Sequence, residues 1–373
     1  RRQSGGMRVD ERAVARRRGE LVKGGVTRAQ LESGDWTSPY FGYHRSAGVN
    51  DPIRQRIVDV VAVGPEDGVV GGWAAAYLQG VAYLDGGWGH PRAGRTVEPS
   101  RSGGSGRTAE PGRSGGSGRT AEPGRTGGSG RTGEPRGTGE RGIGEPVLVV
   151  VPPHRLIRRS GIVTLRASLD ADDLVERQGI RCTSGTRTAY DMLRLAGDLT
   201  SAVVAGDCLL HSGITTVKAI SAYQAGRSSR RGIRQLRAAL PLLDGGAASP
   251  PETRLRMLCR QAGLPSLLVN VPVFDLGGGF LGIVDLLEPF AGLGLEYDGA
   301  QHRELGQHTA DNLREEGLEL NGLAIMRVTS LDLEDEASTI SRIQDAHRRR
   351  LFRDRGAESW SLQPRLAGVG GGL

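Results

Sequence analysis

The clearest hydrophobic pattern in the chain lies in Phe280–His302, where two short apolar runs each end on a carboxylate. Leu281–Val284 precedes Asp285, and Leu293–Leu295 precedes Glu296. A proline and a glycine separate the runs, and short apolar runs bounded by such breakers are typical of β-strands. We expect a hairpin that brings the two carboxylates together, either as a buried pair stabilised by a hard divalent cation or as solvated acids at a turn.

The segments that flank this hairpin predict two helices and a further strand. Prolines before an acidic residue and an apolar-periodic run indicate a helix in Ser249–Leu264, with Glu252 on the face that packs against a sheet. Asp311–Gly322 is typical of a second helix and Leu323–Val328 of a third strand. The order helix, hairpin, helix, strand predicts an α/β core with three carboxylates converging at one end.

Three glycines, Gly277, Gly279 and Gly282, spell the GxGxxG pattern of dinucleotide-binding folds. That motif requires a helix after the glycines, because the helix N-terminus meets the pyrophosphate. An apolar strand follows here instead. We therefore expect a hairpin turn between Val271–Asp275 and Leu281–Asp285.

Residues 249–333 resemble the compact PD-(D/E)XK endonucleases, in the branch similar to very-short-patch repair endonucleases and to an actinobacterial group of domains of unknown function. The combined order and spacing of the matching motifs is more specific than any single motif. They are PPETRLR with Glu252, GIVDL with Asp285, LEYDGAQH with Glu296, Asp298 and His302, DNLRE with Asp311 and Arg314, and IMRVTSLDL.

The resemblance implies a restriction-endonuclease-like core, with a mixed sheet flanked by helices, that cuts DNA with Mg²⁺ or Mn²⁺. It implies that Asp285, Glu296 and the carbonyl of Tyr297 hold the metal. Glu252 would complete the site directly or through water. Arg314 would hold a phosphate oxygen.

One position departs from the family pattern. The family places a lysine two residues after the glutamate, and this chain has Asp298 there. The resembling branch often has a nearby histidine instead, so we expect His302 to act as general base or phosphate contact. Asp298 is expected to support the metal ligands or to bind a second metal. The departure affects proton transfer more than metal binding.

The pattern upstream predicts a second, mixed α/β domain. Its motifs GWAAAYLQGV, VLVVVPPH and IRCTSGTRTAYDML resemble the abortive-infection type IV antitoxin proteins. The resemblance implies one discontinuous domain, 24–93 plus 143–245, with a DNA-binding winged helix and a cognate toxin or defence partner. The winged-helix motif is incomplete in Gly24–Trp36, where we expect Thr27 to cap a short helix. The other expected elements are helices from Asp51, at Gly72–Val81, from about Thr186 and at Leu199–His211, and strands at Val147–Val151 and Ile162–Leu165.

A basic patch in Arg227–Arg237 supplies candidate nucleic-acid contacts outside the motifs. Arg230, Arg231 and Arg234 could contact phosphates, or they could form a solvated helix face. Arg254, in the first predicted helix of the endonuclease-like segment, is a further candidate.

Residues 94–142 are an internal repeat, with the unit GRTxEPxR[ST]GGS recurring from Gly94, Gly106 and Gly118. The repeat has no large apolar residue to bury, so we expect it to be disordered. It could bind nucleic acid as RGG segments do, or it could be an expanded coding repeat tolerated in a surface loop. The absence of aromatic residues for stacking favours the second interpretation.

The net charge of +7 is concentrated outside the predicted domains. Residues 94–142 contribute +4 and residues 1–23 contribute +5, which leaves −2 for the rest of the chain. The basic segment 1–23 is expected to be a solvated tail rather than a basic helix, and 356–373 a disordered tail. The predicted domains are not globally basic, so charge alone gives little support for nucleic-acid binding.

The cysteine spacing and the lengths of the apolar runs indicate the cellular compartment. The three cysteines lie far apart without a CxxC pair, which favours a reducing cytoplasm and no zinc site. We find no apolar run of membrane-spanning length and no signal-peptide pattern near the N-terminus. We therefore expect a cytoplasmic protein with no membrane contact.

The sequence thus predicts a metal-dependent DNA endonuclease in 249–355, joined to the antitoxin-like domain and acting in phage defence or DNA repair. Two alternatives stay open. One is a non-catalytic DNA-binding regulator of a toxin–antitoxin type, which the missing lysine favours. The other is an RNA nuclease. Retention of Glu252, Asp285 and Glu296 together favours the enzyme.

Overall fold

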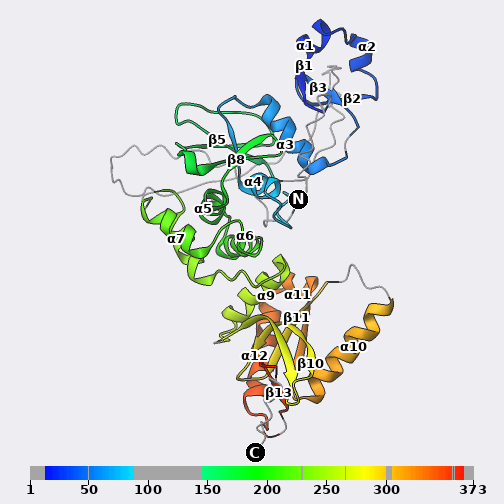
Figure 1. Ribbon diagram of the computed structural model, residues 1–373, viewed down its shortest axis with the longest axis vertical. Coiled ribbons are helices and arrows are strands. Elements are labelled where there is room, and N and C mark those ends of the chain that lie inside the picture. Colours follow the sequence, from blue (N-terminus) through cyan, green and yellow to red (C-terminus); the bar gives the residue numbers. More distant parts are fainter. Residues whose placement is uncertain are drawn as a thin grey trace, which may run out of the picture. The chain divides into compact units, whose positions relative to one another are not determined.

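The computed structural model describes residues 13–48, 50–87, 145–227, 230–264, 266–299, 305–354, 356 and 358–364, with 305–312 described as backbone only (Figure 1). The chain divides into two units. One consists of the segments Arg1–Pro91 and Ile143–Leu373, and the other is Arg92–Gly142. The repeat 94–142 lies outside the described residues. The fold is mixed α/β, with three sheets of mixed or antiparallel strands flanked by helices.

The first sheet is a small antiparallel module of order β1-β3-β2. Thr27 accepts a hydrogen bond from the backbone N–H of Gln30 and caps a short helix, as predicted. Residues 16–23 form a strand and a helix, so the prediction of a solvated tail over 1–23 is wrong for this part. The elements are β1 (Arg16–Arg17), α1 (Arg18–Lys23), α2 (Arg28–Leu31), β2 (Trp36–Tyr40) and β3 (Tyr43–Ser46).

The second sheet has the order β6-β5-β4-β8-β7 and joins segments from both sides of the repeat. Strand β4 (Val69–Gly71) is antiparallel to β5 (Val147–Val151) and parallel to β8 (Ile180–Thr183). The helix predicted from Asp51 forms with that residue as its N-cap. The other elements are α3 (Pro52–Val63), α4 (Gly72–Leu78), β6 (Ile162–Arg166), β7 (Leu174–Arg177), α5 (Gly185–Leu195), α6 (Leu199–His211), α7 (Val217–Ala225) and α8 (Ile233–Ala239).

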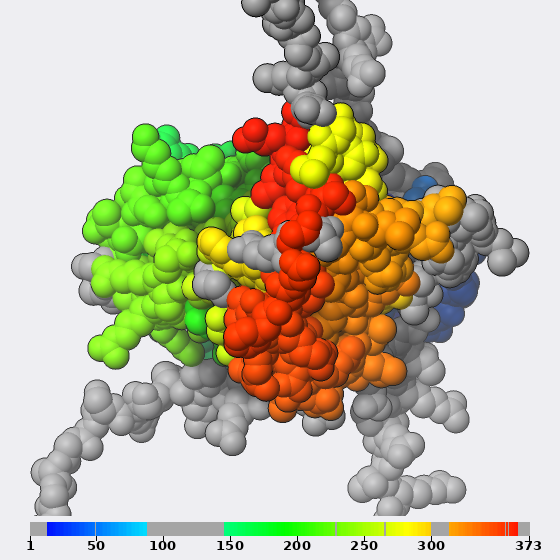
Figure 2. Space-filling view, turned by 90° about the horizontal axis from the view of Figure 1, so that it is seen from below, coloured from blue at the N-terminus to red at the C-terminus, as the bar shows by residue number. Residues whose placement is uncertain are grey.

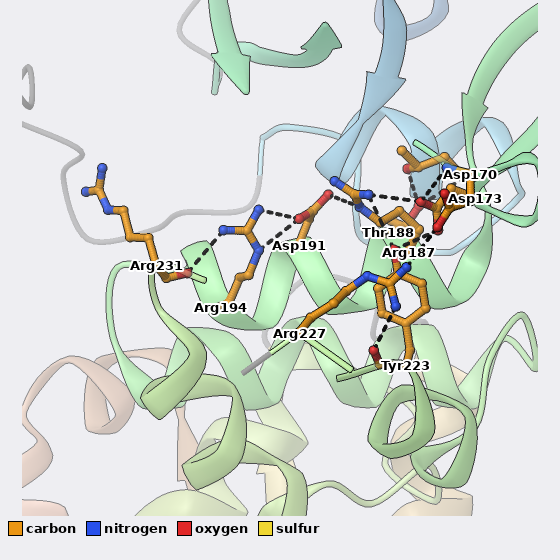
Figure 3. Close-up of polar contacts among 10 residues, drawn as sticks. Asp170, Asp173, Arg187, Thr188, Asp191, Arg194, Tyr223, Arg227 and Arg231 are labelled. Atoms are coloured by element: carbon orange, nitrogen blue, oxygen red, sulfur yellow. Dashed lines mark hydrogen bonds and ion pairs between the residues drawn. The ribbon is translucent and has the colours of Figure 1, made fainter. Parts of the chain in front are cut away.

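A buried ionic network holds α5 in this domain (Figure 3). Arg187 donates to Asp191 at 2.7 Å and to Asp173 at 3.1 Å, and Arg194 donates to the other oxygen of Asp191 at 2.9 Å. Tyr223 of α7 donates its hydroxyl proton to Asp173 at 2.6 Å. The two arginines of this network balance its two carboxylates. The buried charges are therefore neutralised within the network, and we assign it a structural role.

The third sheet has the order β12-β11-β10-β9-β13. All neighbours are antiparallel except β11 and β12, which are parallel. The predicted strands therefore share one sheet, and the glycine-rich segment is a hairpin turn between β9 and β10, as expected. The elements are α9 (Pro250–Gln261), β9 (Leu268–Asp275), β10 (Phe280–Glu288), β11 (Leu293–Asp298), α10 (Leu305–Leu320), β12 (Ala324–Thr329), α11 (Ser330–Glu334), α12 (Glu336–Leu351) and β13 (Trp360–Ser361).

Helices cover both faces of this sheet. Leu255 of α9 and Ile343 of α12 belong to one apolar cluster with Leu295, and Leu318 of α10 belongs to another with Val284. Figure 2 shows α12 (orange-red) at the molecular surface. Within the described residues, no helix is long and apolar enough to span a membrane.

The C-terminal segment departs from its prediction. Residues 356–373 were expected to form a disordered tail, but β13 pairs antiparallel with β9 and forms one edge of the sheet. The pairing places Trp360 opposite Asp275 and Ser361 opposite Phe274. The prediction is wrong for this strand because the edge of a sheet offers unpaired N–H and C=O groups to any nearby segment.

Candidate active site

Asp285 and Glu296 lie on adjacent antiparallel strands. The paired register ends at Leu286 and Leu295, and Asp285 and Glu296 are the next residues on the two strands. Asp285 Oδ2 accepts a hydrogen bond of 2.9 Å from the backbone N–H of Tyr297. In an extended strand the N–H and C=O of one residue point to the same side, so the Tyr297 carbonyl also faces β10.

Glu252 lies in the first turn of α9, where two prolines begin the helix. Its carboxylate accepts hydrogen bonds from the backbone N–H of Ala248 at 2.9 Å, the hydroxyl of Ser249 at 2.8 Å and the side-chain amide of Asn270 at 2.9 Å. All three donors are neutral. Glu252 is therefore held in position without a cation.

Asp285 is in electrostatic contact with both glutamates. Burial raises the pKa of Asp285 to about 6, and repulsion from Glu252 and Glu296 adds to this effect. The hydrogen bond from the Tyr297 N–H and the charge of Arg314 lower the pKa, but they do not cancel the rise. Asp285 thus experiences the charge of both glutamates in the folded protein.

Arg314 binds Glu296 through the two terminal nitrogens of its guanidinium group. NH1 donates to Oε1 at 2.7 Å and NH2 donates to Oε2 at 2.9 Å. NH1 also donates to the carbonyl of Ile283 at 2.9 Å. The side chain of Glu296 is 10% exposed and that of Arg314 is 27% exposed, so the pair is partly buried. The phosphate contact assigned to Arg314 would require it to leave or share Glu296.

The other residues of the predicted site are partly described. Asp298 ends β11 two positions after Glu296, and alternation along the strand puts both on the same face. His302 and the side chain of Asp311 lie outside the described residues. The structure thus places Asp298 beside the site and does not place His302.

Three of the predicted nucleic-acid residues lie on or next to α8, at the molecular surface. Arg230, Arg231 and Arg234 are exposed. The backbone carbonyl of Arg231 accepts a hydrogen bond of 3.1 Å from Arg194, and Figure 3 shows the side chain of Arg231 pointing away from Asp191. These guanidinium groups are accessible to solvent and to a ligand.

Arg254 lies on a different side of α9 from Glu252, because two residues correspond to about 200° of rotation around a helix. Its guanidinium donates to the carbonyl of Leu333 at 3.2 Å. The candidate nucleic-acid contact Arg254 is therefore turned away from Glu252.

The oxygen donors fit Mg²⁺, although they do not form a complete protein cage. No three His, Cys, Asp or Glu side chains lie together as a metal-binding group in the ranges that the structure describes. Mg²⁺ needs only one or two carboxylates, because it keeps several waters. Asp285 Oδ1 accepts no hydrogen bond from any described residue. The Tyr297 carbonyl faces β10, the strand that carries Asp285. Asp285 and Glu296 would therefore be the protein ligands, with Glu252 close by.

Two features near the site were missed in the sequence. Asn270 donates to Glu252, and nothing in the apolar pattern of β9 indicates this contact. Arg256 follows Glu252 by four residues, a spacing typical of a helical ion pair. Its guanidinium instead binds Asp207 of α6 at 2.6 Å, a partner that sequence spacing could not identify.

Comparisons of this chain with protein-family models, with curated proteins and with solved structures give no match.

Proposed function

We propose that residues 249–355 form a metal-dependent endonuclease domain that hydrolyses phosphodiester bonds in DNA. The observation that carries the proposal is the position of Asp285 and Glu296 next to the last paired residues of β10 and β11, with both Glu296 and Glu252 close enough to raise the pKa of Asp285. The order of elements supports it. One helix precedes three antiparallel strands, and a second helix leads to a strand parallel to the third.

Each residue has a distinct role in this proposal. Asp285, Glu296 and the Tyr297 carbonyl would hold Mg²⁺ or Mn²⁺, and Glu252 would accept hydrogen bonds from its coordinated water. Such a cation supplies a water of lowered pKa and offsets the charge that develops on phosphate. His302 would take the proton from the attacking water or contact the phosphate, and Asp298 would support the ligands.

The phosphate-binding groups of the proposed enzyme are arginines. Arg314 would bind an oxygen of the phosphate to be cleaved, since a planar guanidinium matches two phosphate oxygens. The exposed Arg230, Arg231 and Arg234 would bind the DNA backbone without reading its sequence. The antitoxin-like region 24–93 and 143–245 would then connect the cleavage to a toxin or defence partner.

A second candidate is a DNA-binding regulator that retains the sheet only as a scaffold. Three observations favour it. Arg314 already neutralises Glu296, and Asp298 stands where the resembling enzymes have lysine. The third is in the small N-terminal module, where groups that could contact DNA are at the surface. Arg17 and Arg18 are exposed, and Phe41 at the hairpin tip is 100% exposed.

A plasmid-nicking assay with Mg²⁺, Mn²⁺ or chelator separates these candidates. The wild-type chain should nick DNA only with metal, and Asp285→Asn should abolish nicking. Asp345→Asn, which removes an exposed carboxylate on α12, is the matched control and should retain it. Binding of duplex DNA without cleavage of DNA or RNA would instead support the regulator. Cleavage of RNA alone would indicate an RNA nuclease.

A further inference from the structure

Arg314 is held at the candidate metal site by directed hydrogen bonds as well as by its charge. Besides its two hydrogen bonds to Glu296, it donates to the carbonyl of Ile283 on β10. Its guanidinium therefore bridges β10 and β11 from the helix α10. A planar group with several hydrogen bonds in fixed directions has a defined position, unlike a freely moving surface arginine.

Gly282 provides space for the stem of this arginine. A Cβ atom at position 282 would lie 2.8 Å from Cγ of Arg314 and 2.9 Å from its Cδ. These distances are shorter than normal carbon contacts, so any larger residue would push the side chain away. The absence of a side chain at 282 thus lets Arg314 run closely along β10 to Glu296.

The position of Glu296 explains why a cation is needed there. Glu296 is 7% exposed as a whole residue and lies close enough to Asp285 to raise the pKa of that carboxyl. A buried carboxylate that remains ionised requires a partner of opposite charge. Both oxygens of Glu296 are occupied by Arg314. Each oxygen has a second lone pair, but a divalent cation bound there would lie beside the positive guanidinium on the same carboxylate, and the two cations repel each other.

We propose that Arg314 is the resident counter-cation of this site, and that it competes with the divalent metal for Glu296. Metal binding then requires Arg314 to give up at least one of its two hydrogen bonds to Glu296. The donors that leave Glu296 would then bind an anion, for which the phosphate of the substrate is the natural candidate. Metal and phosphate would therefore assist each other's binding. The inference rests on the proposed function for the identity of the metal and the substrate.

The competing interpretation makes the opposite prediction. If Arg314 only orients Glu296 for the metal, its removal would leave the carboxylate misplaced and weaken metal binding. If the two cations compete, its removal frees both oxygens and strengthens metal binding. The sign of the change in metal affinity distinguishes the two.

The test measures Mn²⁺ binding to the full chain by calorimetry, without DNA, together with melting temperature. Arg314→Gln should bind Mn²⁺ about tenfold tighter than wild type, because a charge-assisted contact no longer has to be broken. Its melting temperature without metal should fall, and the increase on adding Mn²⁺ should exceed that of wild type.

Arg342→Gln is the matched control. Arg342 of α12 pairs with Asp332 of α11, so its loss also removes an arginine–carboxylate contact of this domain. Helix α12 packs on Leu295, whose side chain lies on the opposite face of β11 from that of Glu296, so the Mn²⁺ affinity of Arg342→Gln should equal that of wild type. Arg314→Lys keeps a cation with fewer donors, should have intermediate affinity, and provides the test should Arg314→Gln not fold.

Mn²⁺ affinity of Arg314→Gln equal to or below that of wild type would overturn the competition while leaving the metal site intact. If wild type and all variants fail to bind Mn²⁺, both the competition and the proposed metal-dependent function are wrong. Tighter binding in Arg314→Gln without nicking activity in wild type would support the competition and count against the enzyme.

Discussion

The guanidinium of Arg256 donates a 2.6 Å hydrogen bond to the carboxylate of Asp207, and both side chains are almost fully buried. Thr253 donates to the same carboxylate oxygen at 2.9 Å, and the backbone N–H of Asp244 donates to the other at 2.8 Å. Thr253 and Arg256 belong to α9, the helix that carries Glu252 in its first turn. Helix α6, which follows the second sheet, therefore fixes the helix of the candidate active site.

Asp207→Ala should lower the free energy of unfolding by about 3–5 kcal/mol, because it leaves Arg256 buried without its anion. Urea unfolding of the full chain measures this. Glu32→Ala removes the partner of Arg28 in an exposed pair and should change stability by less than about 1 kcal/mol. If both variants lose an equally small free energy of unfolding, the contact between Arg256 and Asp207 does not stabilise the fold.

Stability should depend on pH through Asp285. Its pKa is about 6 in the folded protein and near its ordinary value of 3.8 in the unfolded chain. Between these values the folded state holds a proton that the unfolded state has lost, so stability falls as pH rises from about 4 to 6. The loss at neutral pH is about 3 kcal/mol, from about 1.4 kcal/mol for each unit of the pKa difference.

Asp285→Asn removes this titration and should be more stable than wild type at pH 7.5 and similar to it at low pH. Melting temperatures of both proteins from pH 4 to pH 8, without metal, provide the measurement. Parallel curves for the two proteins would show that Asp285 does not carry the pH dependence.

Cleavage should depend on Asp285 and His302 to different degrees. Asp285→Asn keeps the shape of the side chain but removes the charge that would hold the metal, so Mg²⁺-dependent cleavage should disappear. His302→Ala should reduce the rate by about 10²–10⁴-fold, because activation of water by the metal remains. Single-turnover cleavage rates measure both effects. Full activity of Asp285→Asn would mean that the chemistry lies on other residues.

Deletion of Gly94–Gly142 should leave stability nearly unchanged. The backbone N–H of Glu145 donates to the carbonyl of Gly86 at 2.9 Å, so the two ends of the repeat-bearing segment are already held together. A loop without packed apolar residues contributes little beyond its closure entropy. A large fall in melting temperature on deletion would show that the repeat packs on the folded chain.

Local patterns in the sequence were sufficient for most elements of the candidate site. The prolines before Glu252 and the apolar spacing of α9 predict that helix, because they act within one or two turns. The runs that end on Asp285 and Glu296 predict β10 and β11, since alternation and flanking breakers are also local. Their antiparallel register then brings the two carboxylates together.

The partners of the long charged side chains were decided only by the tertiary structure. Arg314 lies eighteen positions from Glu296 and Arg256 forty-nine from Asp207, so neither pair has a sequence spacing that predicts it. The same holds for β1 and β13, which become strands because an available edge lies beside them. Periodicity determines which face of an element is buried. The fold alone determines which buried charge meets which, because that depends on packing between distant segments.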